Sequence, residues 1–509
     1  MYDILFESPL IIDGSGSAPY RANVATLGDT IAFIGREHVR AKRVIEASHL
    51  TLVPGFIDVH AHSEVYALNT KNAEMKLKQG ITSDISGNCG IGVFPLNENR
   101  DLLKPLNDDV LGKCGIPFSW SDFRSFTSTL RQSGCGINMG FLQPHAPLRI
   151  AVMGEDASRA ATDDEIGKMC DLLEKSLSEG CYGFSTGLYY NPCSFADERE
   201  LEALLCVTAA HDGLFSVHMR SESDEIIEAA EEVLSLALRC SVRLEISHLK
   251  IIGDANQDKL PALLSLIHSY RDRGLEVSFD QYPYNFGSTS LFSLLPPRYL
   301  SLSRSELRFA LQLESEREAM KREILYPEGW ESLYTVVGPE RINIMHLDSR
   351  SDLDGRSLAS LSSSPLDSLF DILSDESGAA VMSDVTESVS TLEAIMQDDL
   401  MHFGTDALYS SFPPHPRSQN ATLEFLKTYV LSKKLFPLEK GISILTHRNA
   451  SLMHIGDRGL VREGAAADLV LLDIDDPEIV IKSVFVNGVP AVEDGRMTGC
   501  LSGRILLEN

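Results

Sequence analysis

The chain has 509 residues, of which 43% are hydrophobic, and a formal net charge of -28. A chain of this size and composition can bury a large core, and it fits one large domain with a smaller one, or two to three ordinary domains. The negative charge argues against non-specific binding to nucleic acid or to an anionic membrane, because both need a basic face. We therefore expect a globular protein with neither of these partners.

The N-terminal stretch MYDILFESPLIID carries Asp3 and Glu7 where a secretion signal would have basic residues and then an unbroken apolar core. No run of about 18 apolar residues predicts a membrane-spanning helix. The nine cysteines are an odd number and form no CxxC pair, which favours reduced thiols. These features predict a cytoplasmic protein.

Both ends of the chain predict short strands. Residues 1–54 contain alternating apolar runs interrupted by Gly, Asp and Ser, which is typical of a small antiparallel sheet. Residues 456–509 repeat this pattern and include an Asn-Gly turn at Asn487 and Gly488. We expect the two ends to pair into one small β-sandwich domain.

Residues 55–455 alternate between strand-like and helix-like segments. This alternation predicts a parallel sheet, and the eight strand-like runs are the number that a (β/α)8 barrel needs. The fold class is therefore α/β, with a TIM-like barrel as the large domain. Around residues 287–350 the alternation gives way to a charged, helical stretch, which we interpret as an insertion that could form a lid.

Ligand-type side chains stand at the ends of the strand-like runs. His60 and His62 end the run LVPGFIDVHAH, and residues two apart on a strand point to the same face. The carboxyl ends of barrel strands converge on one face, where sites are built. Thiolate, imidazole and carboxylate together predict a zinc site, although the pattern also leaves room for a nucleophilic cysteine. The remaining side chains at strand ends are Cys89, His218, His248 and Asp406.

Longer motifs make the chain resemble a known family. These motifs include VPGFIDVHAH, GITSDISGNCG, GFSTGLYY, HMRSE, SHLK, DQYPY, GTDAL and HPR, and the likeness runs nearly end to end. The chain resembles the N-acyl-D-amino-acid deacylases (D-aminoacylases) of the amidohydrolase superfamily. The combination of GNCG with HMRSE and DQYPY is the most specific part of this resemblance.

The resemblance implies a role for each of the predicted ligands. Asp406 matches the catalytic aspartate at the end of the last barrel strand. The thiolate of Cys89 looks like a substitute for the carbamylated lysine of other amidohydrolases. The implied metal sites are a tight zinc site of Cys89, His218 and His248, and a second, weaker site at His60 and His62.

The resemblance also implies a reaction. We expect hydrolysis of the linear amide bond of a small N-acyl-D-amino acid, which gives a carboxylic acid and a free D-amino acid. A zinc-bound hydroxide would attack the amide carbonyl, because zinc lowers the pKa of bound water to about 7. Asp406 would accept the water proton and later deliver it to the leaving amine.

The carboxylate of such a substrate needs cationic donors. Lys250 lies two residues after His248, so it would point the same way if the strand continued that far. By resemblance, Arg417 of HPR and Tyr282 of DQYPY form a clamp for this carboxylate. Tyr190 of GLYY matches a tyrosine of the substrate pocket.

Two other functions are compatible with these residues. One is an amidohydrolase that cleaves a cyclic amide or a dipeptide. The other is a non-catalytic interaction protein on the same barrel, although such proteins lose ligands and all six ligand positions are filled here.

Two further segments contain a histidine or charged side chain outside the predicted ligand set, QPHAPLR and HMRSE. The segment QPHAPLR, Gln143 to Arg149, departs from the GHG segment that relatives often carry, so the role of His145 stays open. Arg220 of HMRSE is expected to be structural and to pair with Glu222 or with another carboxylate at the barrel mouth.

Overall fold

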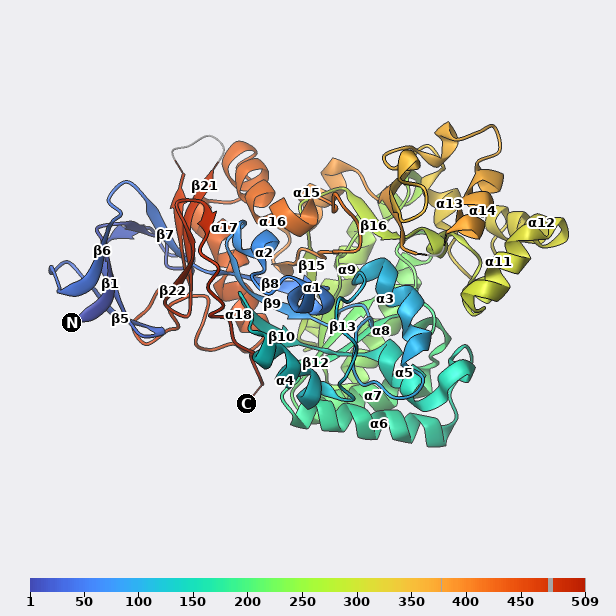
Figure 1. Cartoon of the computed structure of the whole chain (residues 1–509), viewed down its shortest axis with the longest axis horizontal. Coiled ribbons are helices and arrows are strands. Elements are labelled where there is room, and N and C mark those ends of the chain that lie inside the picture. The colour runs from blue at the N-terminus through green and yellow to red at the C-terminus, as the bar shows by residue number, and fades with distance from the viewer. Residues whose placement is uncertain (377, 475–478, 509) are drawn as a thin grey trace.

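The computed structural model describes residues 1–376, 378–474 and 479–508. Residues 475–478 and 509 of the predicted C-terminal β segment lie outside this description. A β-rich lobe contains the N-terminus, a barrel occupies the centre, and a helical lobe projects on the opposite side (Figure 1).

Parallel strands form the central barrel. They belong to two sheets, with the orders β10-β9-β8 and β11-β12-β13-β14-β15-β19. Two contacts join these sheets: Leu142, between β10 and β11, donates from its N to Ser86 O of β9 at 2.9 Å, and Ala61 of β8 bridges Ala407, which follows β19. With β10 and β11 as one interrupted strand, eight strands surround the centre, as the predicted (β/α)8 barrel requires. The strands are β8 (Phe56–Ala61), β9 (Ile81–Ser86), β10 (Asn138–Phe141), β11 (Gln143–Pro144), β12 (Gly183–Gly187), β13 (Leu214–His218), β14 (Arg243–Ile246), β15 (Val277–Gln281) and β19 (Met401–Phe403).

Helices pack around the barrel. Helix α6 (Asp163–Ser178) begins with a capping box, in which Thr162 and Glu165 satisfy each other's backbone N–H groups. Its buried side chains Ile166, Met169 and Leu173 recur every three to four residues, so one face packs against the strands. The helices are α1 (Glu64–Asn69), α2 (Glu74–Leu77), α3 (Lys104–Val110), α4 (Phe123–Ser133), α5 (His145–Met153), α6 (Asp163–Ser178), α7 (Glu198–Ala210), α8 (Ile226–Cys240), α9 (Leu260–Asp272), α15 (Val389–Gln397), α16 (Arg417–Glu424), α17 (Leu438–Leu445) and α18 (His447–Leu452).

Two sheets from both chain ends form the small β lobe. One sheet has the order β5-β4-β1-β6, and the other has the order β23-β22-β21-β20-β7-β2-β3. The two ends pair where β7 meets β20, with Leu52 opposite Leu471. Phe6 and Phe485 belong to the buried apolar layer that the sheets share, so the predicted β-sandwich from both ends is confirmed. The strands are β1 (Tyr2–Glu7), β2 (Leu10–Ile11), β3 (Tyr20–Arg21), β4 (Asn23–Leu27), β5 (Thr30–Gly35), β6 (Ala41–Glu46), β7 (Thr51–Pro54), β20 (Leu469–Asp473), β21 (Val480–Val486), β22 (Val489–Glu493) and β23 (Arg496–Met497).

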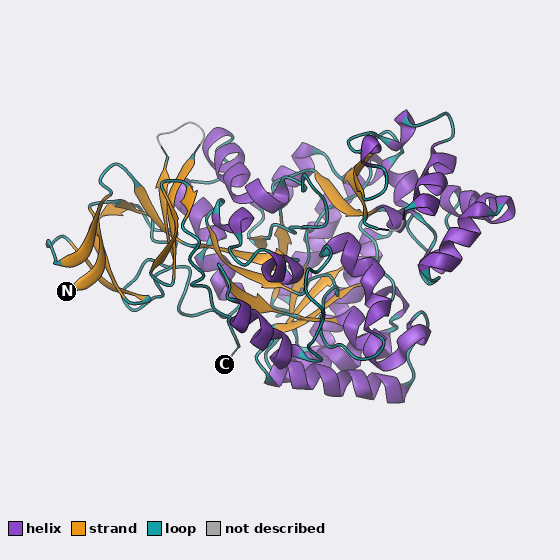
Figure 2. Ribbon diagram, viewed as in Figure 1, coloured by secondary structure: helices purple, strands orange, loops and turns teal. Residues whose placement is uncertain are grey.

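A third group of elements follows β15 and forms the helical lobe (Figure 2). It contains a sheet with the order β16-β18-β17 and an apolar core of its own that includes Leu311, Phe370 and Met382. This group, called the insertion below, begins with Phe286, next to the predicted start at residue 287, and runs past residue 350 to Val385. The domain limits given above stay predictions. Its elements are β16 (Phe286–Ser290), α10 (Pro297–Leu300), α11 (Arg304–Gln312), α12 (Glu314–Leu325), α13 (Leu333–Val337), β17 (Ile342–Leu347), α14 (Pro365–Asp375) and β18 (Ala380–Val385).

All nine cysteines are free thiols in the structure. Within the described residues, none of the helices is both long and apolar enough to cross a membrane.

Candidate metal and substrate site

The six predicted ligands lie at the carboxyl ends of five barrel strands. His60 and His62 flank Ala61, the last residue of β8. All six side chains belong to residues that are at most 7% exposed, so the site is shielded from bulk water. The other four are His218, which ends β13, and Cys89, His248 and Asp406, which follow β9, β14 and β19.

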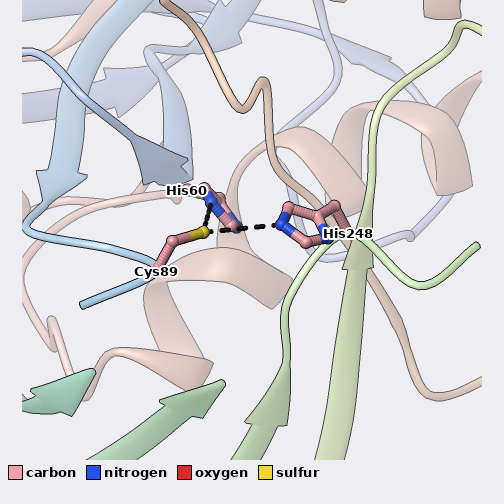
Figure 3. Close-up of side chains that lie close together, drawn as sticks. All are labelled: His60, Cys89 and His248. Atoms are coloured by element: carbon pink, nitrogen blue, oxygen red, sulfur yellow. Dashed lines mark hydrogen bonds between the residues drawn. The ribbon is translucent and has the colours of Figure 1, made fainter. Parts of the chain in front are cut away.

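Cys89 lies between two imidazoles (Figure 3). Its Sγ atom is 3.4 Å from His60 Nε2 and 3.4 Å from His248 Nε2. A tetrahedral zinc ion with Zn–S near 2.3 Å and Zn–N near 2.0 Å separates sulfur from nitrogen by about 3.5 Å. Both sulfur–nitrogen distances therefore match those around one zinc ion, and all three donor atoms lie within 4.8 Å of one another.

Two further groups of donors adjoin this one. His60 Nε2 and His62 Nε2 lie 3.5 Å and 3.2 Å from Asp406 Oδ1. On the other side, His218 Nδ1 lies 2.9 Å from His248 Nε2. Cys89 and His218 thus approach the same nitrogen of His248, and the implied zinc site of these three residues stays a prediction.

Three of the site residues have a left-handed backbone. Cys89, His248 and Asp406 have φ angles of 54°, 36° and 49°. Residues other than glycine rarely adopt this region, and functional sites are where such backbone strain concentrates. Gly187 is needed nearby, because a Cβ at this position would lie 2.4 Å from the carbonyl oxygen of Cys89. Gly187 and Gly90 thus lie where the backbone after β9 and the end of β12 approach each other closely.

Carboxylates behind the imidazoles orient them. His60 Nδ1 lies 2.8 Å from Asp280 Oδ2, which leaves His60 Nε2 directed at Cys89. His248 Nδ1 lies 3.1 Å from Glu222 Oε1. Neither carboxylate was among the predicted site residues. The position of Asp280 at the end of β15 was the signal that could have identified it.

Lys250 reaches the pocket but is already paired. Its ammonium lies 2.8 Å and 3.0 Å from the two carboxylate oxygens of Glu222 and 2.7 Å from His248 Nδ1. The strand does not continue to Lys250, because β14 ends at Ile246. The expected same-face relation therefore does not hold, and the turn after β14 brings Lys250 to the site.

Arg220 pairs with Glu232 at 3.0 Å, the second of the two options that the sequence allowed.

The predicted substrate-binding residues line one pocket together with three of the predicted ligands, His218, His248 and Asp406. Arg417 Nη1 lies 2.8 Å from Asp406 Oδ2, and its guanidinium carbon is 4.8 Å from the centre of the Tyr282 ring. The Tyr190 ring lies 4.8 Å from that of His218. The pocket also contains side chains that the sequence did not indicate, and these are Glu222, Glu331, Asp384, Ser288 and Thr289.

Burial keeps the imidazoles neutral. It lowers the pKa of His60, His62 and His248, and it lowers the pKa of His218 to about 3. Neutral imidazole is the form that binds a metal ion. Burial, together with the charge of Asp406, raises the pKa of the Cys89 thiol, so its thiolate needs a neighbouring cation.

Asp406 is held in its ionised form. Burial by itself would raise the pKa of this carboxyl, but Arg417 and a hydrogen bond from His62 hold it well below its usual range. The site therefore has an ionised carboxylate beside neutral nitrogen donors.

His145 belongs to a buried network behind the pocket. Its Nδ1 lies 2.8 Å from Thr186 Oγ1, and its Nε2 lies 2.8 Å from Glu200 Oε1. Arg149 pairs with the same glutamate. Both ring nitrogens are therefore used within the protein, and His145 is not among the residues that line the pocket.

The whole chain is similar to known amidohydrolases. The amidohydrolase family matches residues 373–491. The D-aminoacylase of Alcaligenes xylosoxydans xylosoxydans is 30% identical, and the alignment covers 99% of this chain and 97% of that relative. A crystal structure of D-aminoacylase is 28% identical, with a TM-score of 0.83 and full coverage of both chains. The N-acyl-D-glutamate deacylase of Bordetella bronchiseptica, solved with zinc and a phosphonate that mimics the tetrahedral intermediate, is 27% identical with a TM-score of 0.81 over 99% of each chain.

Proposed function

Because this chain belongs to the N-acyl-D-amino-acid deacylase family of amidohydrolases, we propose that it is a zinc-dependent enzyme that hydrolyses the linear amide bond of small N-acyl-D-amino acids. The products would be a carboxylic acid and a free D-amino acid. The observation that carries the proposal is the position of Cys89 Sγ, 3.4 Å from each of two imidazole nitrogens and close to the Asp406 carboxylate. The relative that was solved with zinc supports the choice of metal.

The donor set fits zinc by its chemistry and its spacing. Cys89, His60 and His248 would hold the ion, with His218 next to them, and His62 and Asp406 would share a second position with His60. Zinc bound there supplies a Lewis acid that polarises the amide carbonyl and makes water a stronger acid. His62 Nδ1 is buried without a hydrogen-bond partner, so the second position contains one histidine without the orienting contact that Asp280 gives His60. This difference supports one tight and one weaker site.

Asp406 is the residue placed to move protons. Its carboxylate is ionised and lies 3.2 Å from His62 Nε2, in the donor group that also contains His60. We assign to it the acceptance of a proton from the attacking water and the delivery of that proton to the amine as the C–N bond breaks.

Arg417, Tyr282 and Lys250 would bind the substrate carboxylate. Arg417 Nε is buried without an acceptor, and a substrate carboxylate would supply one. Tyr190, which contacts Thr289 Oγ1 at 3.3 Å, would close the pocket on the side of the insertion.

Amine release from paired N-acetyl-D- and N-acetyl-L-amino acids tests the proposal. The panel should include neutral, acidic and basic side chains, and the zinc content of the enzyme should be measured in the same samples. We expect turnover of D members only. Equal turnover of both hands, or turnover confined to cyclic amides or dipeptides, would contradict the proposed function.

A further inference from the structure

The substrate pocket has more negative than positive side chains. Among its lining residues, four are carboxylates (Glu222, Glu331, Asp384 and Asp406) and two are cations (Lys250 and Arg417). The two cations are already engaged, since Lys250 pairs with Glu222 and Arg417 pairs with Asp406, each at 2.8 Å. Asp384 and Glu331 form no ion pair within the described part of the chain, although Lys250 and Arg417 lower the pKa of Asp384 from a greater distance.

Asp384 occupies a position where the strand pattern calls for an apolar residue. It lies on β18, two and four residues after Met382 and Ala380, which belong to the apolar core of the insertion. Residues two apart on a strand share a face, so this face turns from apolar to acidic where it reaches the pocket. Asp384 is only 4% exposed, and a buried charge without a counterion is costly. Asp384 therefore lies where the apolar core of the insertion meets the pocket.

The carboxylate faces the substrate-binding residues. Asp384 pairs with Gly287 of β16, and a Cβ at Gly287 would lie 3.2 Å from Asp384 Oδ1 and 3.6 Å from Tyr282 Oη. The glycine therefore leaves open the space between the carboxylate and the tyrosine. An extended side chain of a bound amino acid could place its end group in this space.

Glu331 adds a second carboxyl group from the insertion. It accepts hydrogen bonds from Ser221 Oγ at 2.5 Å and from the backbone N–H of Glu222 at 3.2 Å. Burial raises the pKa of Glu331 to about 7 and that of Asp384 to about 6. A cation in the pocket would stabilise the ionised form of both groups.

We infer that the preferred substrate is an N-acyl-D-amino acid whose side chain ends in a cation, an ammonium or a guanidinium, and that Asp384 is the residue that recognises it. This inference rests on the proposed deacylase function and names its substrate class. An acidic side chain would meet Asp384 and Glu331 without a free cation, and a neutral one would leave the Asp384 carboxylate unpaired. The charges of the pocket thus favour the basic class over both alternatives.

The first test compares three substrates of the zinc-loaded enzyme. Nα-acetyl-D-lysine carries a free side-chain ammonium. N-acetyl-D-norleucine has the same four-carbon side chain without it, and N-acetyl-D-glutamate carries the opposite charge. We expect kcat/KM for the lysine substrate to exceed that for the norleucine substrate at least about tenfold, since a charge-assisted contact is lost without the ammonium. The glutamate substrate should be the poorest of the three.

The second test changes Asp384. Asp384→Asn keeps the shape and removes the charge, and it should lower kcat/KM for the lysine substrate about tenfold more than for the norleucine substrate. Asp384→Glu should retain the preference for lysine. Asp109→Asn is the matched control, because Asp109 is also a buried carboxylate that contacts the insertion, through Ser290 and Arg304, but it does not line the pocket. This control should keep the ratio of the two substrates unchanged.

The outcomes separate the inference from the proposed function. Hydrolysis of the norleucine or glutamate substrate as efficient as that of the lysine substrate would overturn the inference and leave the deacylase function standing. An equal loss for both substrates in Asp384→Asn would show a structural role and would also overturn it. Absence of turnover with every D substrate would overturn the proposed function, and the inference with it.

Discussion

Arg417 Nη1 lies 2.8 Å from Asp406 Oδ2. Arg417, proposed to bind the substrate carboxylate, is therefore ion-paired with Asp406, proposed to transfer the proton. Arg417 also donates from Nη2 to the backbone carbonyl of Ser288 at 3.1 Å. One guanidinium thus connects the loop after β19, the start of α16 and strand β16 of the insertion. A substrate carboxylate must join or replace this pair.

Arg417→Lys should therefore weaken substrate binding although it keeps the charge. Lysine lacks the planar fork that binds a carboxylate with two parallel hydrogen bonds. We expect KM for N-acetyl-D-norleucine to rise at least about tenfold, and KM for its amide, which lacks the carboxylate, to change far less. Arg341→Lys, in an exposed pair with Asp254, serves as the control. Equal losses for the acid and the amide would show that Arg417 acts only on Asp406.

Asp406→Asn should lower kcat at least about 100-fold with zinc retained, because general acid–base catalysis contributes factors of this size. The decisive comparison is kcat against the zinc content of the same preparation. Asp254→Asn, at an exposed carboxylate, is expected to behave like the parent. Activity of Asp406→Asn within about tenfold of the parent would contradict its assignment as the proton carrier.

Cys89→Ala should lose bound zinc. The thiolate would be removed from a group in which Sγ lies 3.4 Å from two imidazole nitrogens, so we expect the affinity for zinc to fall at least about 100-fold. Mass spectrometry after dialysis against a weak chelator measures how much zinc the variant retains. Cys193→Ala is the control, because Cys193 is equally buried but belongs to none of the donor groups. Full zinc occupancy of Cys89→Ala would rule out Cys89 as a ligand.

His145 should make the stability of the protein depend on pH. Burial by itself would lower its pKa, but Cys193 and Glu200 together raise the pKa of His145 to about 9 from the ordinary 6.5. A pKa that is raised in the folded state gives stability that is complete below pH 6.5 and is lost as the pH rises through 9. Relative to His145→Gln, the free energy of unfolding should fall by up to about 3 kcal/mol across this interval.

Urea unfolding at pH 6 and pH 9.5, with a chelator present throughout, measures this difference without a contribution from zinc release. His402→Gln is a control of opposite sign, because burial lowers the pKa of His402 to about 3, so its contribution to the free energy of unfolding rises rather than falls between pH 6 and pH 9.5. A difference between the parent and His145→Gln that does not fall between pH 6 and pH 9.5 would show that the pKa of His145 is not raised in the folded protein.

The sequence by itself determined the fold and the place of the site. Alternation of apolar runs is a local property of the chain, and the carboxyl ends of parallel strands meet on one face, so His60, His62, Cys89, His218, His248 and Asp406 could be assigned to that face before any coordinates were known. The strand pattern at both ends likewise predicted the β-sandwich.

Only the tertiary structure decided which side chains pair within the site. Asp280 reaches His60 across 220 positions of the chain, and Glu222 reaches Lys250 rather than Arg220. The acidic Asp384 comes from an insertion whose strands carry no ligand motif. These contacts depend on barrel closure and on residues with left-handed backbones after the strands, such as His248, and no local periodicity encodes either. The sequence thus specified the ligand types, whereas long-range packing specified their partners and the charge of the pocket.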